Sequence, residues 1–340
     1  MRFREIAPSI APLSEVGFGV WSVATTWWGI KDKEVGIRLL REAKELGVNF
    51  FDTANVYGQG LGETVLQEAF GDDIKEIIIG TKFGYDFEEG VVRTGHGELP
   101  QDWSPEFIRK TCESSLRRLG RDWIDIYQLH NPRIEAVQST EILETLKALQ
   151  KEGKILEYAA ALGPDIGWAE EGHAAMNEGG YKILQVIYSL LEQDPTSELI
   201  PTAEKTGAKF IVRVPHASGL LDGSYNPQKH FDKSDHRSHR KDLWMQAGIE
   251  GVELLKGVLS KERSLAESAI LFCLAASPVV TVLPNFTRSE QIKTFTAAVE
   301  KSRFSKTELE KVFTLWENTL AAKLDQPFAD SRSKPTPKAA

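Results

Sequence analysis

Short runs of β-branched and other apolar residues recur along the chain, and longer segments with hydrophobic residues at helical spacing lie between them. This alternation is typical of repeated βα units that build a parallel sheet. The predicted strands are Val16–Val20, Phe50–Asp52, Ile77–Thr81, Trp123–Leu129, Ile155–Ala161, Ile183–Ile187, Phe210–Val214 and Val279–Leu283. Eight such units in 340 residues favour an α/β fold of the closed (β/α)8 TIM-barrel type.

A doubly wound open sheet is the alternative fold. It would require a GxGxxG turn after the first strand, and the segment from Gly17 to Trp21 does not complete one. Helices are predicted at Lys33–Leu46, Glu63–Phe70, Pro105–Leu119, Ser139–Gln150, Ser289–Val299 and Lys306–Leu324. The order Ser104, Pro105, Glu106 is favourable for a helix start, and Gly120 provides a stop.

The two ends of the chain add to the barrel pattern. Residues Arg2–Pro12 predict a small β-hairpin that could plug the base of the barrel, and two extra helices follow the last strand. The charged segment Gly219–Leu243 predicts a long loop after strand seven, on the active face. We therefore expect a single domain over residues 1–324 and a flexible tail over residues 325–340, which is rich in Pro, Lys and Ser.

Charge and composition narrow the class of protein. The 49 acidic and 41 basic residues leave a net charge of -8, and no basic stripe interleaved with aromatics is present, so a nucleic-acid partner is not expected. The chain has neither an apolar run of about 20 residues nor a signal-type start, which predicts a cytoplasmic protein that does not enter the membrane. Cys112 and Cys273 are far apart and should be buried thiols. No metal site is predicted, although His230, His236 and His239 share one loop.

Ionisable residues follow three of the predicted strands at the point where each strand ends. Asp52 ends strand two, Lys82 follows strand three, His130 follows strand four, and Tyr57 lies shortly after Asp52. Each alone could be structural. Asp52 could cap a turn and Tyr57 could pack on the barrel rim, while His130 could be a core histidine and Lys82 a solvated cation. The carboxyl ends of barrel strands meet at one mouth, however, and a lysine ammonium beside a phenol favours the phenolate. Together the four residues suit proton transfer at a substrate oxygen.

The segments FDTANVYGQGLGETVL, IIIGTKFG, SLRRLGRDWIDIYQLHNP and QVIYSLLEQ resemble blocks of the aldo-keto reductase family, over essentially Arg2–Lys323. The resemblance implies a barrel that binds a nicotinamide cofactor without a Rossmann domain and transfers hydride to or from an aldehyde, ketone or sugar. It implies Asp52, Tyr57, Lys82 and His130 as the catalytic residues, a small carbonyl or alcohol as the substrate, and a monomer by default.

The same resemblance implies a cofactor site and a substrate pocket. The implied cofactor residues are Gly19, Val20, Trp21, Asp52, Gln185, Arg213, Pro215, Leu220, Asn285, Arg288 and Gln291. The implied pocket residues are Trp21, Trp27, Trp28 and Asn131, with buried packing as the alternative for the tryptophans. NADP(H) is favoured over NAD(H), because Arg288 lies one position from the usual arginine for the 2′-phosphate, beside a helix start that offers free N–H groups.

Departures from the family pattern leave questions open. Leu162 lies where a Ser-Asn pair usually binds the carboxamide, so Gln185 is expected to provide the remaining contact. Arg213 replaces an aromatic residue and could stack on the nicotinamide or turn away to pair with Asp222. Glu63 lies where the family usually has an acid after the tyrosine, and it could have a functional role or only stabilise the first turn of the helix. The altered carboxamide and stacking positions, Leu162 and Arg213, support the alternative of a catalytically weak, nucleotide-sensing barrel that regulates a protein partner.

Overall fold

Eight parallel strands follow one another around a single sheet, in a computed structural model that describes residues 1–25, 29–87, 98–164, 168–223 and 242–324. The strands are β3 (Phe18–Gly19), β4 (Phe50–Asp52), β5 (Ile78–Phe83), β6 (Ile124–His130), β7 (Ile155–Ala161), β8 (Ile183–Ile187), β9 (Lys209–Arg213) and β10 (Val279–Leu283). A parallel bridge between Val16 and Val282 joins the two ends of the sheet. The prediction of a (β/α)8 barrel is confirmed.

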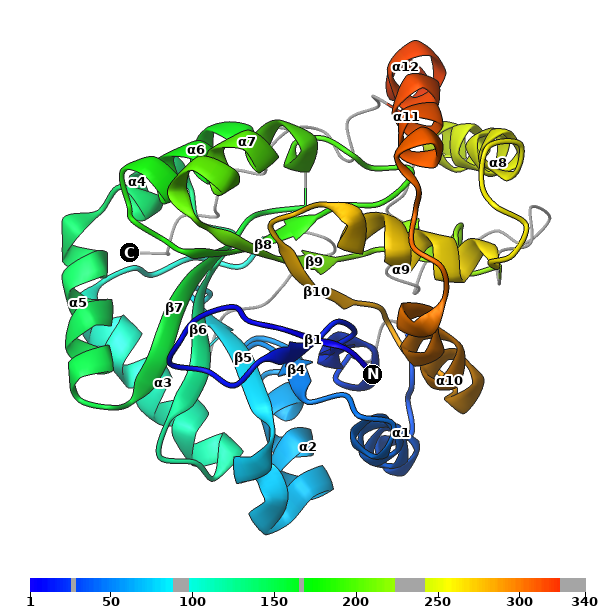
Figure 1. The fold of residues 1–340 in the computed structure, drawn as a ribbon. Helices are drawn as coiled ribbons and strands as arrows, with labels where there is room; N and C mark the ends of the chain where they lie inside the picture. Colours follow the sequence, from blue (N-terminus) through cyan, green and yellow to red (C-terminus); the bar gives the residue numbers. More distant parts are fainter. Residues whose placement is uncertain (26–28, 88–97, 165–167, 224–241, 325–340) are drawn as a thin grey trace.

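Helices surround the strands on the outside (Figure 1). They are α1 (Lys33–Glu45), α2 (Leu61–Phe70), α3 (Pro105–Leu119), α4 (Ile134–Val137), α5 (Thr140–Lys151), α6 (Ala169–Asn177), α7 (Thr196–Thr206), α8 (Asp242–Lys256), α9 (Leu265–Ala275) and α10 (Ser289–Ala297). The start of α3 is fixed by the Ser104 side chain, which accepts from the N–H of Phe107, and its end by Gly120 at φ 63°. No helix within the described ranges is both long and apolar enough to cross a membrane.

The C-terminal helices stand at one side of the barrel, next to α8 (Figure 1). The predicted helix Lys306–Leu324 is divided into α11 (Lys306–Leu315), a π-helical turn η6 (Trp316–Leu320) and α12 (Ala321–Leu324). The predicted loop Gly219–Leu243 ends at the start of α8, and its residues 224–241 lie outside the described ranges. The predicted tail, residues 325–340, also lies outside them.

The N-terminal hairpin lies across one end of the ring of strands (Figure 1). It pairs β1 (Phe3–Arg4) with β2 (Leu13–Ser14), so its second strand begins just after the predicted segment. Its apolar side chains form one buried cluster with the inward-facing starts of the strands, which includes Ile6, Ile10, Leu13, Phe50, Ile78, Ile126, Ile183 and Ile211. The interior is therefore filled with hydrocarbon at this end.

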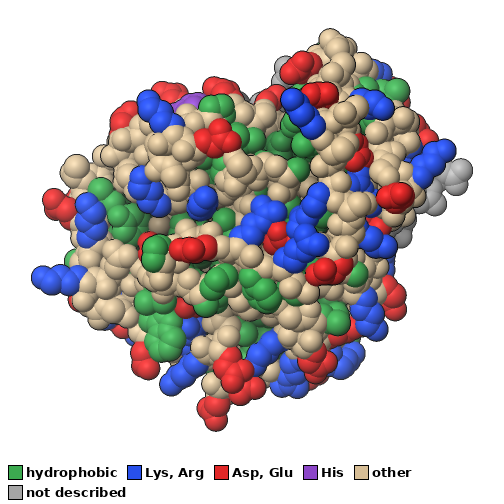
Figure 2. Space-filling view, in the orientation of Figure 1, with side chains coloured by type: hydrophobic (Ala, Val, Ile, Leu, Met, Phe, Trp, Pro, Cys, Tyr) green, Lys and Arg blue, Asp and Glu red, His purple; other side chains and the backbone are tan. Residues whose placement is uncertain are grey.

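On the face seen in Figure 2, positive and negative side chains are interspersed.

Polar residues replace these apolar ones two positions further along the strands. Asp52, Gln128, Gln185 and Arg213 lie two residues after Phe50, Ile126, Ile183 and Ile211, respectively. Since residues i and i+2 of a strand point to the same face, these polar side chains also face the interior. The carboxyl end of the barrel therefore presents a polar layer above an apolar floor.

Candidate active site

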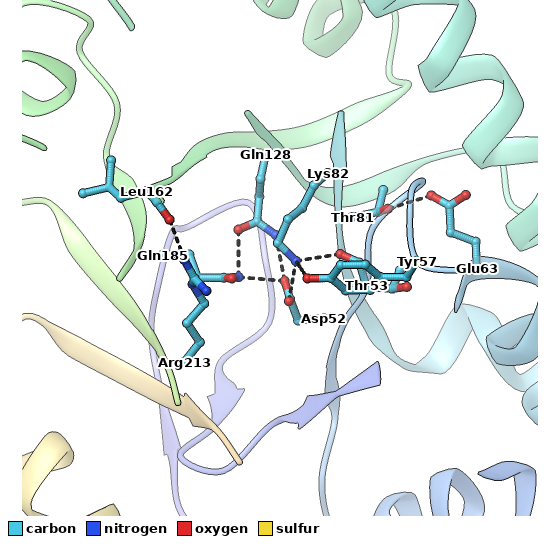
Figure 3. A network of polar contacts seen from close by, with 10 residues as sticks. All are labelled: Asp52, Thr53, Tyr57, Glu63, Thr81, Lys82, Gln128, Leu162, Gln185 and Arg213. Atoms are coloured by element: carbon cyan, nitrogen blue, oxygen red, sulfur yellow. Dashed lines mark hydrogen bonds and ion pairs between the residues drawn. The ribbon is translucent and has the colours of Figure 1, made fainter. Parts of the chain in front are cut away.

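Lys82 is the centre of a buried cluster at the carboxyl ends of β4 and β5 (Figure 3). Its Nζ atom donates to Asp52 Oδ2 at 2.5 Å, to the Thr53 carbonyl at 2.7 Å and to the Tyr57 hydroxyl at 3.4 Å. The Lys82 side chain is 1% exposed and that of Asp52 is 5% exposed. A buried ammonium is stable only when it is paired and hydrogen-bonded, and these acceptors match its three protons. The structure thus brings Asp52, Lys82 and Tyr57 together.

Two glutamines hold the other oxygen of Asp52. Gln128 and Gln185 each donate from Nε2 to Asp52 Oδ1 at 2.8 Å, and Gln185 also donates to Gln128 Oε1 at 3.1 Å. Because a carboxylate only accepts, the NH2 group of Gln185 must face Asp52. Only its Oε1 is then left for a carboxamide contact. Sequence reasoning missed Gln128, although an amide inside an apolar strand, two residues before His130, is a usable signal.

Aromatic rings surround the Tyr57 phenol. Trp21 is stacked on it with ring centroids 5.7 Å apart and an interplanar angle of 17°, and His130 meets it edge-on at 5.9 Å. Trp21 reaches this position because the predicted strand Val16–Val20 ends at Gly19 and a 3-10 helix, Val20–Val23, follows. All four predicted catalytic residues therefore lie in one cluster, with Trp21 beside them.

Glu63 fixes the helix that follows Tyr57. Its side chain is fully buried, accepts from Thr81 Oγ1 at 2.6 Å and pairs with Arg118 Nε at 2.6 Å. These bonds tie α2 to β5 and α3. The neighbouring Gly62 allows a close approach, since a Cβ there would lie 2.4 Å from Thr53 Oγ1. Glu63 thus supports the position of Tyr57 through packing of the elements around it.

Arg213 extends from the end of β9 towards the end of β7. Its Nη2 donates to the Leu162 carbonyl at 2.7 Å (Figure 3). Burial lowers the pKa of Arg213, while the charges of Tyr57 and Asp52 act in the opposite direction. Among the described residues it forms no pair with Asp222, which instead accepts from Gln291 at 3.4 Å. The guanidinium therefore stays at the mouth of the barrel, on the side of Tyr57 and Asp52.

The remaining predicted cofactor residues lie at the ends of β3, β9 and β10. Gly19 lies against Asn285, because a Cβ on Gly19 would be 3.5 Å from Asn285 Oδ1. Gln291 Oε1 accepts from the N–H and the hydroxyl of Thr287, both at 2.9 Å. Arg288 is exposed at the start of α10, which has no side-chain cap. Uncapped N–H groups beside a cation suit an anion.

The turn after β9 is buried against α10. It contains Pro215 and Leu220, and Val214, Ala217 and Ser218 have positive φ values of 58°, 46° and 58°. Between them His216 lies 4.3 Å from the ring of Phe295, and burial lowers the pKa of His216 to about 4. The predicted pocket residues Trp27 and Trp28 lie outside the described ranges.

Comparison with known proteins agrees with this geometry. A sequence profile described as "Aldo/keto reductase family" matches residues 15–317. The chain belongs to the aldo/keto reductase family. Two curated relatives of this aldo/keto reductase are an uncharacterized oxidoreductase, YqkF, of Bacillus subtilis and an NADH-specific methylglyoxal reductase of Escherichia coli. The first is 27% identical over 91% of this chain and 94% of the relative, and the second is 29% identical over 84% and 90%.

Solved structures of the family share its fold. The aldo-keto reductase AKR11C1 from Bacillus halodurans, in its holo form, is 30% identical, with a TM-score of 0.75 over 93% of this chain and 96% of that one. The glycerol dehydrogenase AKR11B4 from Gluconobacter oxydans is 25% identical, with a TM-score of 0.77 over 99% of both chains. This aldo/keto reductase is thus similar to oxidoreductases along almost its whole length.

Proposed function

We propose that this aldo/keto reductase transfers a hydride between a nicotinamide cofactor and the carbonyl carbon of an aldehyde, ketone or sugar. The observation that carries the proposal is the Lys82 ammonium, which bonds at once to the Asp52 carboxylate and the Tyr57 hydroxyl. The names of two similar proteins, a methylglyoxal reductase and a glycerol dehydrogenase, refer to carbonyl and alcohol chemistry of this kind.

Tyr57 is the proposed proton donor to the substrate oxygen. As the phenol gives up its proton, negative charge develops on an oxygen that already faces Lys82 Nζ, and the fixed ammonium stabilises it. Asp52 keeps the ammonium in place and is itself held by Gln128 and Gln185. His130, edge-on to Tyr57, is the proposed hydrogen-bond donor that orients the carbonyl.

The residues present fit a nicotinamide dinucleotide, which would supply the hydride when bound. The 2′-phosphate of NADP(H) fits the uncapped start of α10 beside Arg288, and the carboxamide NH2 group of either cofactor fits Gln185 Oε1. We propose NADP(H) as the preferred form, because Arg288 is an exposed cation at that helix start. The substitution Arg288→Gln should raise the KM for NADPH about tenfold and leave that for NADH unchanged.

The control for the cofactor experiment lies one turn further along α10. Lys293 is also exposed, but it is paired with Glu42 at 3.6 Å. Lys293→Gln should therefore change the two KM values little. An equal change for NADPH and NADH in Arg288→Gln, or a wild-type enzyme that prefers NADH, would contradict the proposed NADP(H) preference.

The test of the proposed reaction is Tyr57→Phe. Cofactor oxidation is followed with a panel of small aldehydes, ketones and sugars, and cofactor binding is measured by fluorescence titration. Loss of the acid should lower kcat by about 10² or more while the cofactor still binds. Unchanged turnover would overturn the assignment of Tyr57. Tight cofactor binding by a wild-type protein that turns over no member of the panel would favour a nucleotide-sensing barrel instead.

A further inference from the structure

A chain of polar contacts lies beside His130 and takes no part in the reaction proposed above. Asn131 Nδ2 donates to the Tyr85 hydroxyl at 2.8 Å, and the Tyr85 hydroxyl donates to Glu98 Oε1. Glu98 Oε2 in turn pairs with Arg133 Nη2 at 2.7 Å. These residues come from the segment after β5, the segment before α3 and the segment after β6. Residues far apart in sequence therefore meet next to the catalytic histidine.

The direction of each hydrogen bond in this chain follows from its charged end. The Glu98 carboxylate, ion-paired with Arg133, has only acceptor atoms, so the Tyr85 O–H must donate to it. The Tyr85 oxygen is then left as an acceptor, and Asn131 must face it with its NH2 group. Burial and the nearby Glu98 charge raise the pKa of Tyr85 well above its ordinary value of 10.0, so the phenol keeps its proton. The amide oxygen of Asn131 is consequently directed away from Tyr85.

The backbone of Asn131 is held as firmly as its side chain. Gln101 Nε2 donates to the carbonyls of His130 and Asn131 at 2.9 and 3.1 Å. Asn131 itself has φ 52°, a left-handed conformation that asparagine tolerates better than most residues. The Tyr85 ring meets His130 edge-on at 4.9 Å. The orientation of the Asn131 amide is therefore determined before any substrate binds.

Asn131 Oδ1 is an acceptor that needs a donor. The residue is half-buried and follows His130 directly, and within the described ranges its Oδ1 accepts no hydrogen bond from the protein. A hydroxyl group is the substrate donor that fits such an acceptor. A carboxylate or a second carbonyl has no proton to offer.

We propose that Asn131 Oδ1 binds a hydroxyl group on the carbon next to the reacting carbonyl, and that the substrates are therefore hydroxyaldehydes or hydroxyketones. Tyr85 is the positioning residue, because its hydroxyl fixes the amide of Asn131. The inference rests on the proposed function and names the substrate class of the same site. In the reductive direction, lactaldehyde takes hydride from the cofactor at its carbonyl carbon and a proton at its carbonyl oxygen, which yields propane-1,2-diol.

The test compares two aldehydes that differ by one hydroxyl group, lactaldehyde and propanal. The wild-type kcat/KM should be about tenfold higher for lactaldehyde, the size of one half-exposed hydrogen bond. Asn131→Gly, which tolerates the left-handed backbone, and Tyr85→Phe, which frees the amide to turn, should both bring this ratio close to one. Tyr158→Phe is the matched control, since Tyr158 packs on Tyr181 and its loss should leave the ratio unchanged.

The outcomes of this comparison are separable. A wild-type ratio close to one, or a ratio that persists in Asn131→Gly, would overturn the hydroxyl site. An equal loss for both aldehydes in Tyr85→Phe would show a merely structural tyrosine and overturn its positioning role. Efficient propanal reduction without a preference for lactaldehyde contradicts this inference alone. Failure to reduce either aldehyde while other members of the panel are turned over would overturn this inference alone. No turnover of any member of the panel with either cofactor would overturn the proposed function and this inference with it.

Discussion

The substitution Asp52→Asn tests how strongly the buried ion pair holds the site together. In the wild type, Asp52 Oδ1 accepts from two glutamine amides and Oδ2 accepts from Lys82. Asparagine keeps the shape but has only one acceptor oxygen. In one orientation its NH2 group faces the ammonium, and in the other it faces the two glutamine NH2 groups. Each orientation places donors against donors.

The expected cost follows from the burial of the pair. Removing one partner of a buried ion pair leaves an uncompensated charge and costs about 3–5 kcal/mol of unfolding free energy. The chain offers a matched control, Glu152→Gln, because Glu152 pairs with Arg109 at 2.8 Å with both side chains about 40% exposed. That pair is exposed to solvent, so its loss should change the unfolding free energy little.

The assay is equilibrium unfolding in urea, followed by tryptophan fluorescence at pH 7, with cofactor oxidation measured on the same preparations. Asp52→Asn should unfold at a clearly lower urea concentration than Glu152→Gln and should lose most of its turnover. If the two variants were equally stable, the Asp52 carboxylate would not be what keeps the Lys82 charge in the interior.

Two further predictions concern the cofactor and pH. Arg213, fixed on the Leu162 carbonyl, should repel the positively charged ring of the oxidised nicotinamide. Titration of both cofactor forms should therefore show that Arg213→Tyr strengthens binding of the oxidised form more than binding of the reduced form. A difference of about 1.4 kcal/mol would correspond to a tenfold change in the ratio of the two dissociation constants. An equal change for both forms would contradict this prediction. His216 has its pKa lowered to about 4 in the folded state, against 6.5 in the unfolded chain, so stability should fall as pH drops from 6.5 to 4. The loss of unfolding free energy is about 2 kcal/mol at pH 5. The test compares the stability of wild type and His216→Gln at pH 7.5 and pH 5. An equal loss in the two proteins would refute the prediction.

Much of the fold is predictable because its signals are local. The helix Pro105–Leu119 agrees with the prediction at both ends, since Ser104 and Gly120 act within one turn of them. The strand Phe50–Asp52 is likewise predicted by its own residues. The helix Leu265–Ala275 is harder to predict, because eight of its eleven residues are buried and it has no polar face. The π-helical turn Trp316–Leu320 leaves no pattern that distinguishes it from an α-helix.

The cluster of proposed catalytic residues was predictable for a topological reason. Asp52, Lys82 and His130 end neighbouring strands, and the parallel register necessarily brings such ends together. The contacts of Gln128 and Tyr85 were not predictable, because their partners lie far away in sequence. Which way each amide faces depends on the charge of a neighbour, and only the assembled structure shows that neighbour.

Transfer of deuteride tests the central claim most directly. The wild-type enzyme is incubated with a small aldehyde and reduced cofactor that carries deuterium at both C4 positions of the nicotinamide, and the alcohol product is analysed by mass spectrometry. Direct hydride transfer predicts an alcohol with one deuterium on the former carbonyl carbon, and a much smaller yield with Tyr57→Phe. An alcohol without deuterium, or no alcohol from any aldehyde of the panel, would contradict the proposed reaction.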